Sequence, residues 1–505
     1  MASENLKQTI QGYENYIQSH GIDETVIEAY VEACSVAINN EKDTEYGLQL
    51  TKRSKELIER YCMAQTGGTI WDLEKYAQDS SSSYQLINQY YEILKLETFW
   101  NFESFMYYME KKRPYGKRFY YPRRKSLGIV IKDLEDLENR VIKFYGLSMP
   151  SRVGKSTICI FFLAWIALRR PNSHSAMGGH SGILAKGFYK ELMNLFTTEE
   201  YTFAELFAFW HPEYAKKALP TDKSADEFTI TLGDHDRFAT VTCRGIDGTW
   251  TGAVDVSKDG YLYVDDLVRD REHSLSPIRM ETTFQEYLNK MVDRKNDGAR
   301  ELMVGTLWNV LDPLERLRKL YEGNPEYRFR RIPALDDNDE SNFDYEINGF
   351  STAYYRDMRE RLDKAEWEAK FMQRPFVREG LLFPTDELRY FNGILPDGDF
   401  RRIGVTDIAW GGGDSLSMPI GAEYENGDVY IYDWVFNGGP KEVTVPLVVG
   451  RIVGNEIRQT RFEGNVGGDL YCQYVDEKLQ DIGYKCSCTS KKAPNTVEKL
   501  AKIIA

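Results

Sequence analysis

The hydrophobic positions of this chain change their spacing along the sequence. From the start to about Met109, apolar residues recur at helical spacing with few β-branched runs and few prolines, which predicts a helical N-terminal region. Short continuous apolar runs then alternate with Gly-rich or polar turns, as is typical of buried strands in an α/β domain. They include residues 141–149, 261–264 and 302–309. From Phe400 onward, strand patterns and a turn signal at Asn426-Gly427 predict a second sheet.

These changes predict four segments. They are a helical region (1–110), an α/β domain (111–340), a linker (341–398) and a second sheet-containing domain (399–505). The linker is predicted from the acidic run DDNDESNFDYE, a charged helix over residues 353–372, and the breakers Arg374-Pro375 and Gly380.

Composition restricts the class of protein. The formal charge is 64 − 78 = −14, so the chain is not a globally basic nucleic-acid binder, and any DNA contact must come from local positive patches. Seven cysteines form no C-x-x-C pair, which suits a reducing compartment without structural zinc. The N-terminus has no basic-then-apolar signal, and the longest apolar run, residues 158–168, is too short to span a bilayer. We therefore expect a soluble protein with no membrane partner.

The run at residues 141–149 leads into a turn, and Gly154 then precedes a second apolar segment that opens with Lys155 and Ser156. In a phosphate-binding loop, backbone N–H groups face the nucleotide phosphates, a lysine reaches the β and γ oxygens, and a hydroxyl holds Mg²⁺. The sequence departs from G-x-x-x-x-G-K-[ST] at its first glycine, which is Met149 here. Taken alone, a strand-to-helix turn with a chance Gly-Lys-Ser is the alternative.

Two further strands end in residues that a nucleotide site needs. Residues 261–264 run directly into Asp265 and Asp266. In a Walker B strand the first carboxylate secures Mg²⁺, and the second orients or deprotonates the attacking water. At the tip of the run at 302–309, Thr306 and Asn309 are candidates for sensing the γ-phosphate. The predicted nucleotide contacts are Ser151, Arg152, Val153, Gly154, Lys155, Ser156, Thr157, Asp265, Thr306 and Asn309.

Two other segments have a functional and a plainer interpretation. Residues 111–125, KKRPYGKRFYYPRRK, hold eight basic residues interleaved with aromatic ones. Such a strip can follow phosphates and stack bases, or pack an adenine ring; a solvated linker with aromatic anchors is the alternative. His180, in SHSAMGGHS, could contact substrate, although a histidine without a Cys or His partner at ligand spacing more often has a structural role.

The order of these motifs resembles the large terminase subunit of tailed bacteriophages, an ATP-driven DNA-packaging motor with an attached nuclease. The resemblance covers roughly positions 95–505 and rests on RFYYPRRK, SMPSRVGKST, GGHS, RGIDGTWTG, YLYVDD, GTLWN and EWEAKFMQRPFVREGLLF. It implies a RecA-like P-loop (ASCE) ATPase domain and an RNase H-like nuclease domain. Terminase phosphate loops often lack the first glycine, so Met149 fits. By resemblance, Arg152 would stabilise charge on the transferring phosphoryl group in cis; a surface arginine is the alternative.

The resemblance also implies catalytic acids in the last domain. Asp407 ends its first predicted strand, and Glu463, in RFEGNVGGDLY, matches the second acid of the family. Such a nuclease needs carboxylates from separate strands converging on two metal ions about 3.5–4 Å apart. Asp414 and Asp433 are weaker candidates. The sequence ends at LAKIIA, before the third acidic site of the family, so we expect a C-terminally incomplete nuclease domain and poor cleavage.

The predicted catalytic residues are therefore Arg152, Asp266, Asp407 and Glu463, and the predicted metal ligands are Ser156, Asp265, Asp407 and Glu463. ATP and Mg²⁺ are the implied cofactors, with Mn²⁺ possible at the nuclease site. The implied partners are viral double-stranded DNA, the small terminase subunit and the portal protein of the procapsid, with a homo-oligomeric ring on the portal in the cytoplasm of the infected bacterium.

Two alternatives from the residues stay open. A superfamily 2 helicase or repair ATPase usually follows Walker B with a D-E-x-[HD] tetrad, which Asp265-Asp266-Leu267-Val268 breaks. A DNA-binding assembly scaffold with a degenerate nucleotide site would bind ATP without turnover.

Overall fold

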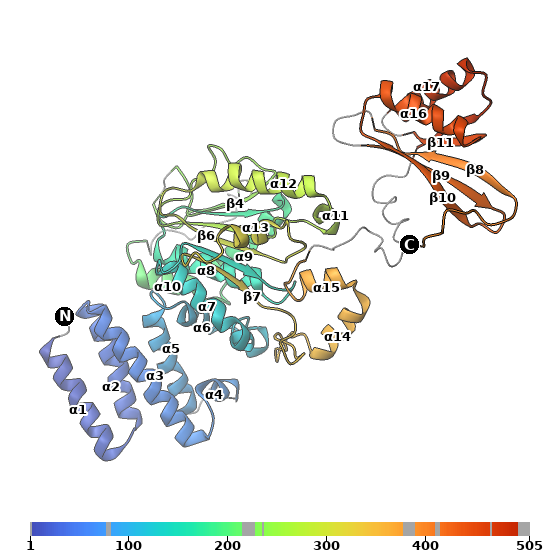
Figure 1. The fold of residues 1–505 in the computed structure, drawn as a ribbon. Helices are drawn as coiled ribbons and strands as arrows, with labels where there is room; N and C mark the ends of the chain where they lie inside the picture. The colour runs from blue at the N-terminus through green and yellow to red at the C-terminus, as the bar shows by residue number, and fades with distance from the viewer. Residues whose placement is uncertain are drawn as a thin grey trace. The chain divides into compact units, whose positions relative to one another are not determined.

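Helices form the first part of the chain, as the spacing of its apolar residues predicts (Figure 1). The computed structural model describes residues 3–76, 82–214, 228–234, 237–376, 389–409, 415–464 and 467–492. The first six helices are α1 (Glu4–His20), α2 (Glu24–Ser35), α3 (Thr44–Thr66), α4 (Ile70–Tyr76), α5 (Ser82–Glu97) and α6 (Phe102–Met109). Ser3, Asp23 and Asn101 cap three of them, because each side chain accepts a hydrogen bond from the backbone N–H three residues further on. Within the described residues, no helix has both the length and the apolar character to cross a bilayer.

A seven-stranded sheet follows (Figure 1). Its strands are β1 (Phe144–Ser148), β2 (Ser175–Gly179), β3 (Thr229–Ile230), β4 (Val241–Gly245), β5 (Tyr261–Asp265), β6 (Arg300–Gly305) and β7 (Tyr327–Arg331), in the order β3-β4-β2-β5-β6-β1-β7. All neighbours are parallel except β3 and β4. One strand, β6, separates the phosphate-loop strand β1 from the acidic strand β5, which is the RecA-like, additional-strand order. The loops after β1, β5 and β6 therefore meet at one edge of the sheet.

Helices cover both faces of this sheet. They are α7 (Arg124–Glu138), α8 (Lys155–Arg169), α9 (Gly182–Thr197), α10 (Phe203–Trp210), α11 (Arg271–Ser274), α12 (Pro277–Glu286) and α13 (Pro313–Leu320). Successive residues of β5 point to opposite faces, so Tyr261 and Tyr263 pack with α8 while Leu262 and Val264 pack with α12 and α13. Burial on both faces explains why these strands have continuous rather than alternating apolar runs.

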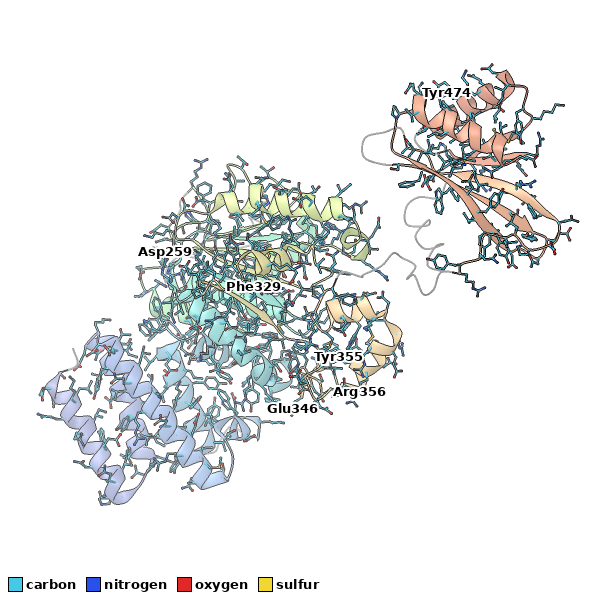
Figure 2. The ribbon with its side chains drawn as sticks, in the orientation of Figure 1. Asp259, Phe329, Glu346, Tyr355, Arg356 and Tyr474 are labelled. Atoms are coloured by element: carbon cyan, nitrogen blue, oxygen red, sulfur yellow. The ribbon has the colours of Figure 1, made fainter. Side chains whose placement is uncertain are left out.

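The segment after β7 packs against the same core. It contains α14 (Thr352–Arg361) and α15 (Lys364–Lys370), whose Tyr355 and Trp367 are buried in one cluster with α8; Tyr355 is labelled in Figure 2. The Glu346 carboxylate, also labelled there, accepts a 2.5 Å hydrogen bond from the Tyr115 hydroxyl. The chain divides into two units, Met1–Arg378 and Glu379–Ala505. Residues 341–376 of the predicted linker thus belong to the first unit, and residues 377–388 lie outside the described part.

In its described residues, the second unit contains a five-stranded mixed sheet and two helices. Its elements are β8 (Phe400–Thr406), β9 (Leu416–Tyr424), β10 (Val429–Asn437), α16 (Lys441–Gly454), β11 (Gln459–Glu463), α17 (Gly468–Asp481) and β12 (Ser487–Lys491), in the strand order β10-β9-β8-β11-β12. The first three strands are antiparallel, and β8, β11 and β12 are parallel. This is the RNase H-like order, and α16 and α17 pack on one face around Met418, Val448 and Phe462.

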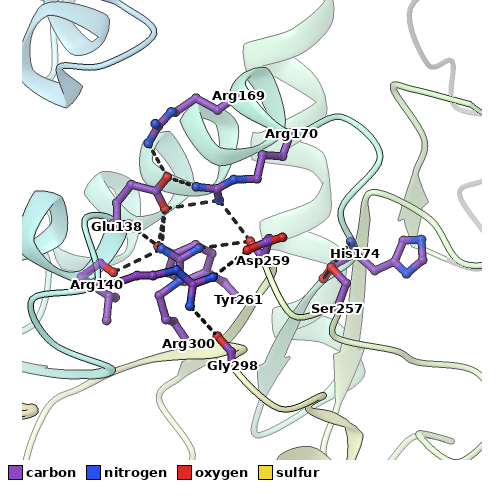
Figure 3. A network of polar contacts seen from close by, with 11 residues as sticks. Glu138, Arg140, Arg169, Arg170, His174, Ser257, Asp259, Tyr261, Gly298 and Arg300 are labelled. Atoms are coloured by element: carbon purple, nitrogen blue, oxygen red, sulfur yellow. Dashed lines mark hydrogen bonds and ion pairs between the residues drawn. The ribbon is translucent and has the colours of Figure 1, made fainter. Parts of the chain in front are cut away.

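A buried carboxylate joins helices and strands at the sheet edge where β5 and β6 begin (Figure 3). Glu138, the last residue of α7, has a side chain that is 1% exposed and forms ion pairs with Arg169 and Arg170 at the end of α8. Arg300, at the start of β6, donates to it at 2.9 Å, and the Tyr261 hydroxyl at 2.6 Å. Because three guanidinium groups share one carboxylate, the network is stable only while that carboxylate is present.

We expect Glu138→Ala to lower the free energy of unfolding by about 3–5 kcal/mol, because it leaves buried guanidinium groups without their counter-charge. Urea denaturation followed by circular dichroism measures the effect. Glu322→Ala is the matched control: Glu322 is 75% exposed and 3.6 Å from Arg318, so its loss should cost about 0–1 kcal/mol. Equal losses in the two variants would contradict the importance of the network.

Candidate active site

The phosphate loop connects β1 to α8, and Gly154 and Lys155 lie where it becomes helical. Gly154 has a φ of +108° and precedes the first turn of α8, a conformation that favours glycine. Lys155 is 5% exposed, and its ammonium lies 3.0 Å from the Thr306 hydroxyl and 3.3 Å from a carboxylate oxygen of Asp266. Ser156 and Thr157 lie half-buried in the first turn of α8. The predicted lysine and hydroxyl are therefore at the N-terminus of a helix, where anions bind.

Buried residues, two of them distant in sequence, hold this loop in place. Met149, in place of the usual glycine, is fully buried in the main core. The Tyr345 hydroxyl donates a 3.1 Å hydrogen bond to the carbonyl of Val153. Gln373, which is fully buried, accepts a hydrogen bond from the hydroxyl of Ser148 at the end of β1. The loop is thus fixed through side chains and carbonyls that the motif does not include.

Asp265 ends β5 and is 2% exposed. Burial, reinforced by the charge of Asp266, raises the pKa of Asp265 to about 7, although Lys155 and the Ser156 hydroxyl act in the opposite direction. Its Oδ1 atom is buried and has no hydrogen-bond partner among the described residues. A buried carboxylate oxygen without a donor, next to a serine hydroxyl, fits the ligands that Mg²⁺ takes in such sites.

Asp266 is oriented by contacts on its backbone and its side chain. It has a φ of +39°, and its N–H donates to the carbonyl of Val304 at 3.0 Å. Its Oδ1 accepts a 3.0 Å hydrogen bond from the N–H of Thr306, while Oδ2 faces Lys155. Because the side chain is 32% exposed, this carboxylate can reach a water molecule, unlike that of Asp265.

The other predicted contacts of the nucleotide differ in their surroundings. The Thr306 hydroxyl lies 3.5 Å from that of Ser151 and donates to the carbonyl of Met149 at 3.3 Å. Asn309 instead donates to the carbonyl of Ser274 and accepts from the N–H of Leu311. Of the two sensor candidates, only Thr306 therefore contacts Lys155. Arg152 is exposed, with a φ of +68°, and in the described part of the chain its guanidinium has no hydrogen bond or ion pair.

Part of the basic and aromatic strip at residues 111–125 is packed into the protein, while Lys112, Lys117, Arg124 and Lys125 are exposed. Tyr120 is fully buried, and Arg118 donates to Glu74 at 2.7 Å and 2.9 Å. The Phe119 ring would lie 2.8 Å from a Cβ at Gly154, and the Arg123 guanidinium lies 5.0 Å from its centre. These contacts favour a linker with aromatic anchors over a strip that binds bases. This part of the strip packs against the phosphate loop.

The two acids predicted for the second unit come from neighbouring parallel strands. The pairing of β8 with β11 runs from Ile403 opposite Gln459 to Thr406 opposite Phe462. Continued by one residue, this register sets Asp407 opposite Glu463, at the carboxyl ends of both strands, where paired strands are about 4.8 Å apart. Asp407 is exposed and Glu463 half-buried.

The third acid of that site has no clear candidate. Asp433 lies on the edge strand β10, accepts a 2.8 Å hydrogen bond from Asn455 and pairs with Arg451 at 3.3 Å. Asp414 lies outside the described residues. Among the residues that the structure describes, no group of three or more His, Cys, Asp or Glu side chains could hold a metal ion.

Two further residues lie near Asp266: His180, which the sequence offered as a possible substrate contact, and Asp312, which no motif indicated. The imidazole of His180 lies 2.9 Å from the carbonyl of Asp266. Asp312 is buried near Asp266, and burial raises the pKa of Asp312 to about 7. The sequence Asp312-Pro313 does have the pattern of a helix cap, and Asp312 does cap α13, but its proximity to Asp266 depends on the folded sheet edge.

Comparisons with known proteins give structural matches alone. No family model matches the chain, and no curated protein matches it. The chain is similar to the large terminase of bacteriophage HK97, at 13% identity over 74% of this chain and 83% of that one, with a TM-score of 0.36. The large terminase of a thermophilic bacteriophage matches at 11% identity over 75% and 83%, with a TM-score of 0.32. The Phi-28 gp11 DNA packaging motor matches at 11% over 72% and 94%, with a TM-score of 0.24.

We expect Gly154→Ala to weaken ATP binding by about fivefold to 150-fold. The new Cβ would meet the Phe119 ring at 2.8 Å in a backbone with a φ of +108°, and strain of about 1–3 kcal/mol corresponds to that range of affinity. Binding of a fluorescent ATP analogue measures it. Gly187→Ala is the control, because Gly187 lies in α9 with no atom within 4 Å of a new Cβ. Unchanged affinity in Gly154→Ala would contradict this geometry.

Proposed function

We propose that this chain is a viral DNA-packaging motor of the large-terminase type, which hydrolyses ATP to translocate double-stranded DNA and has an RNase H-like nuclease as its second unit. The observation that supports the ATPase best is the convergence of Lys155, Asp266 and Thr306 at one edge of the sheet. Lys155 begins α8 after the loop that follows β1, whereas Asp266 and Thr306 directly follow β5 and β6. The order of motifs in the sequence supports the packaging role.

The geometry suggests how the residues act on ATP. The backbone of the loop and the N-terminus of α8 bind the phosphates, and Lys155 moves from Asp266 to the β and γ oxygens. This movement frees the Asp266 carboxylate to orient the attacking water and accept its proton. Ser156 and Asp265 would hold Mg²⁺, which neutralises charge that develops on the phosphates.

Arg152 and Thr306 would act at the γ-phosphate. Arg152 is exposed beside the loop without an ion pair in the described part of the chain, so its guanidinium can turn towards the transferring phosphoryl group at little cost. Thr306 contacts both Lys155 and Asp266, so loss of the γ-phosphate would change its surroundings directly. Asn309, bound to the carbonyl of Ser274, would respond through α11 rather than by contact.

The remaining parts of the proposal come from the sequence resemblance. The partners would be viral double-stranded DNA, a small terminase subunit and the portal protein of the procapsid, with several copies forming a ring in the infected cell. With a net charge of −14, the chain would bind DNA through local basic patches in a salt-dependent way. Asp407 and Glu463 would be the metal ligands of a nuclease that cuts concatemeric DNA by two-metal hydrolysis.

A steady-state assay of phosphate release tests the motor. Lys155→Ala should abolish hydrolysis through loss of ATP binding. Asp266→Asn should lower kcat by about 10²–10⁴-fold, as is typical for loss of a general base. Because Lys155 pairs with Asp266 at 3.3 Å, the same variant should bind ATP at least as tightly as the parent chain. Double-stranded DNA should stimulate hydrolysis by the unmodified chain.

The outcomes separate the candidate functions. ATP binding without turnover, with or without DNA, would favour an assembly scaffold with a degenerate nucleotide site. Normal turnover by Asp266→Asn would remove that residue from its proposed role. Lys319→Ala serves as a control, because Lys319 lies near the C-terminal end of α13, and its removal should leave both ATP binding and hydrolysis unchanged.

For the nuclease, we expect slow cleavage of plasmid DNA with Mn²⁺ that Asp407→Asn or Glu463→Gln abolishes, because one carboxylate cannot hold two metal ions. Gel analysis of nicked and linear products measures it. ATP hydrolysis should be unchanged in both variants, since the two sites lie on separate units. Asp428→Asn, in the turn between β9 and β10, is the control. Full cleavage by Asp407→Asn would exclude this acid from the site.

A further inference from the structure

His180 and Asp266 follow two strands that lie side by side. In the pairing of β2 with β5, Gly179 lies opposite Asp265, so the next residue of each strand is His180 and Asp266. The strands come close here because residue 179 is a glycine: a Cβ at this position would meet the carbonyl of Asp265 at 3.3 Å and the Leu184 side chain at 2.7 Å. The imidazole is thereby brought to the main chain of Asp266.

The hydrogen bond between them has a defined direction. The Nδ1 atom of His180 lies 2.9 Å from the carbonyl oxygen of Asp266. A carbonyl oxygen can only accept, so Nδ1 must carry the proton. This leaves Nε2 to accept a hydrogen bond when the ring is neutral. Within the described residues, His180 therefore bonds to the backbone of Asp266 and leaves the carboxylate of that residue to other partners.

The backbone of Asp266 needs such support. Its φ of +39° places a residue that has a Cβ in the left-handed region, which persists only where surrounding contacts determine it. The N–H of Asp266 is fixed by the carbonyl of Val304 on β6, and its carbonyl is fixed by His180 on the β2 side. The peptide groups on both sides of Cα are thus held from the two neighbouring strands.

We propose that His180 is a positioning residue for ATP hydrolysis. It holds the carbonyl of Asp266 so that the carboxylate points to Lys155 and to the N–H of Thr306, where an attacking water would be oriented. The inference rests on the proposed role of Asp266.

The position of the donor atom gives a sharp experiment. The side-chain amide of asparagine places an N–H close to the position of Nδ1, whereas that of glutamine places it close to the position of Nε2. His180→Ala and His180→Gln should both lower the kcat of phosphate release about tenfold to a hundredfold, a typical effect of a displaced catalytic group. The KM for ATP should change less than about threefold, because Lys155 and the loop are not altered. His180→Asn should restore most of kcat.

A second histidine provides the matched control. His211 also bonds a carbonyl through a ring nitrogen, at 2.6 Å from the carbonyl of Leu168 near the far end of α8. His211→Ala should reduce thermal stability. At a temperature at which this variant is still folded, its kcat should equal that of the unmodified chain. Equal kcat in His180→Ala and the unmodified chain, or a kcat of His180→Gln as high as that of His180→Asn, would overturn the inference while the proposed ATPase stands.

A measurement that does not depend on ATP turnover tests the His180 contact separately from the proposed ATPase function. Nitrogen-15 NMR of histidine-labelled protein, with His180→Asn used for assignment, should show the ring of His180 protonated at Nδ1. A neutral ring protonated only at Nε2 would overturn the inference whatever the rate. If the unmodified chain hydrolyses no ATP under any condition, the proposed function fails, and with it the catalytic meaning of the His180 contact, even when Nδ1 is protonated.

Discussion

The contact between the Lys155 ammonium and the Asp266 carboxylate is the interaction on which the arrangement of the proposed nucleotide site depends. A lysine side chain that is 6% exposed must have polar partners, because an unpaired buried charge is costly. Its two partners follow the ends of the neighbouring strands β5 and β6, and β6 separates β5 from β1, the strand that leads into the loop before Lys155. The ammonium therefore reaches across the tip of β6, and Thr306 at that tip becomes a member of the site. Substrate phosphate would compete for the same ammonium, so binding and the release of Asp266 are one event.

Charged groups lie at both ends of the strands of the large sheet, but their pairing differs between the two ends. At the edge where β5 and β6 begin, Glu138 is fully compensated by three guanidinium groups and a tyrosine hydroxyl, and any rearrangement there would leave a buried charge unpaired. At the other edge, Asp265 keeps an oxygen without a partner among the described residues, and the Asp266 carboxylate is a third exposed. Among the described residues, the Glu138 carboxylate is thus paired where β5 and β6 begin, whereas at the opposite strand ends carboxylate oxygens remain available to a ligand.

Local sequence pattern predicted the parts of the site that a strand end or helix start determines. Lys155, Ser156 and the Asp265-Asp266 pair could be found because a phosphate loop and an acidic strand end each lie within a few residues. The residues that depend on long-range packing could not be placed in this way. The Met149 side chain, in the place of a glycine, is buried in the core. The strip at residues 111–125 buries Arg118 and Tyr120, and Asn309 bonds to α11 rather than to the site. The resemblance supplied Asp407 and Glu463, and it needed the register of β8 and β11 to show that two acids 56 positions apart (463 − 407) share a sheet edge.

The segment before the second unit is part of the support of the nucleotide site and not a free tether. Gln373 contacts Ser148 at the end of β1, and the Lys370 ammonium lies 4.7 Å from the centre of the Trp308 ring, beside Thr306 and Asn309. Asp363, which caps α15, pairs at 3.2 Å with Arg271 on α11, the helix that Asn309 also contacts. The end of β1 and the segment after β6 thus contact α15 or the residues that follow it. Packed interiors respond to a change mainly by switching between discrete contacts. In the proposed function, a change at Thr306 would therefore reach this segment through the neighbouring contacts of Trp308 with Lys370 and of Asn309 with α11.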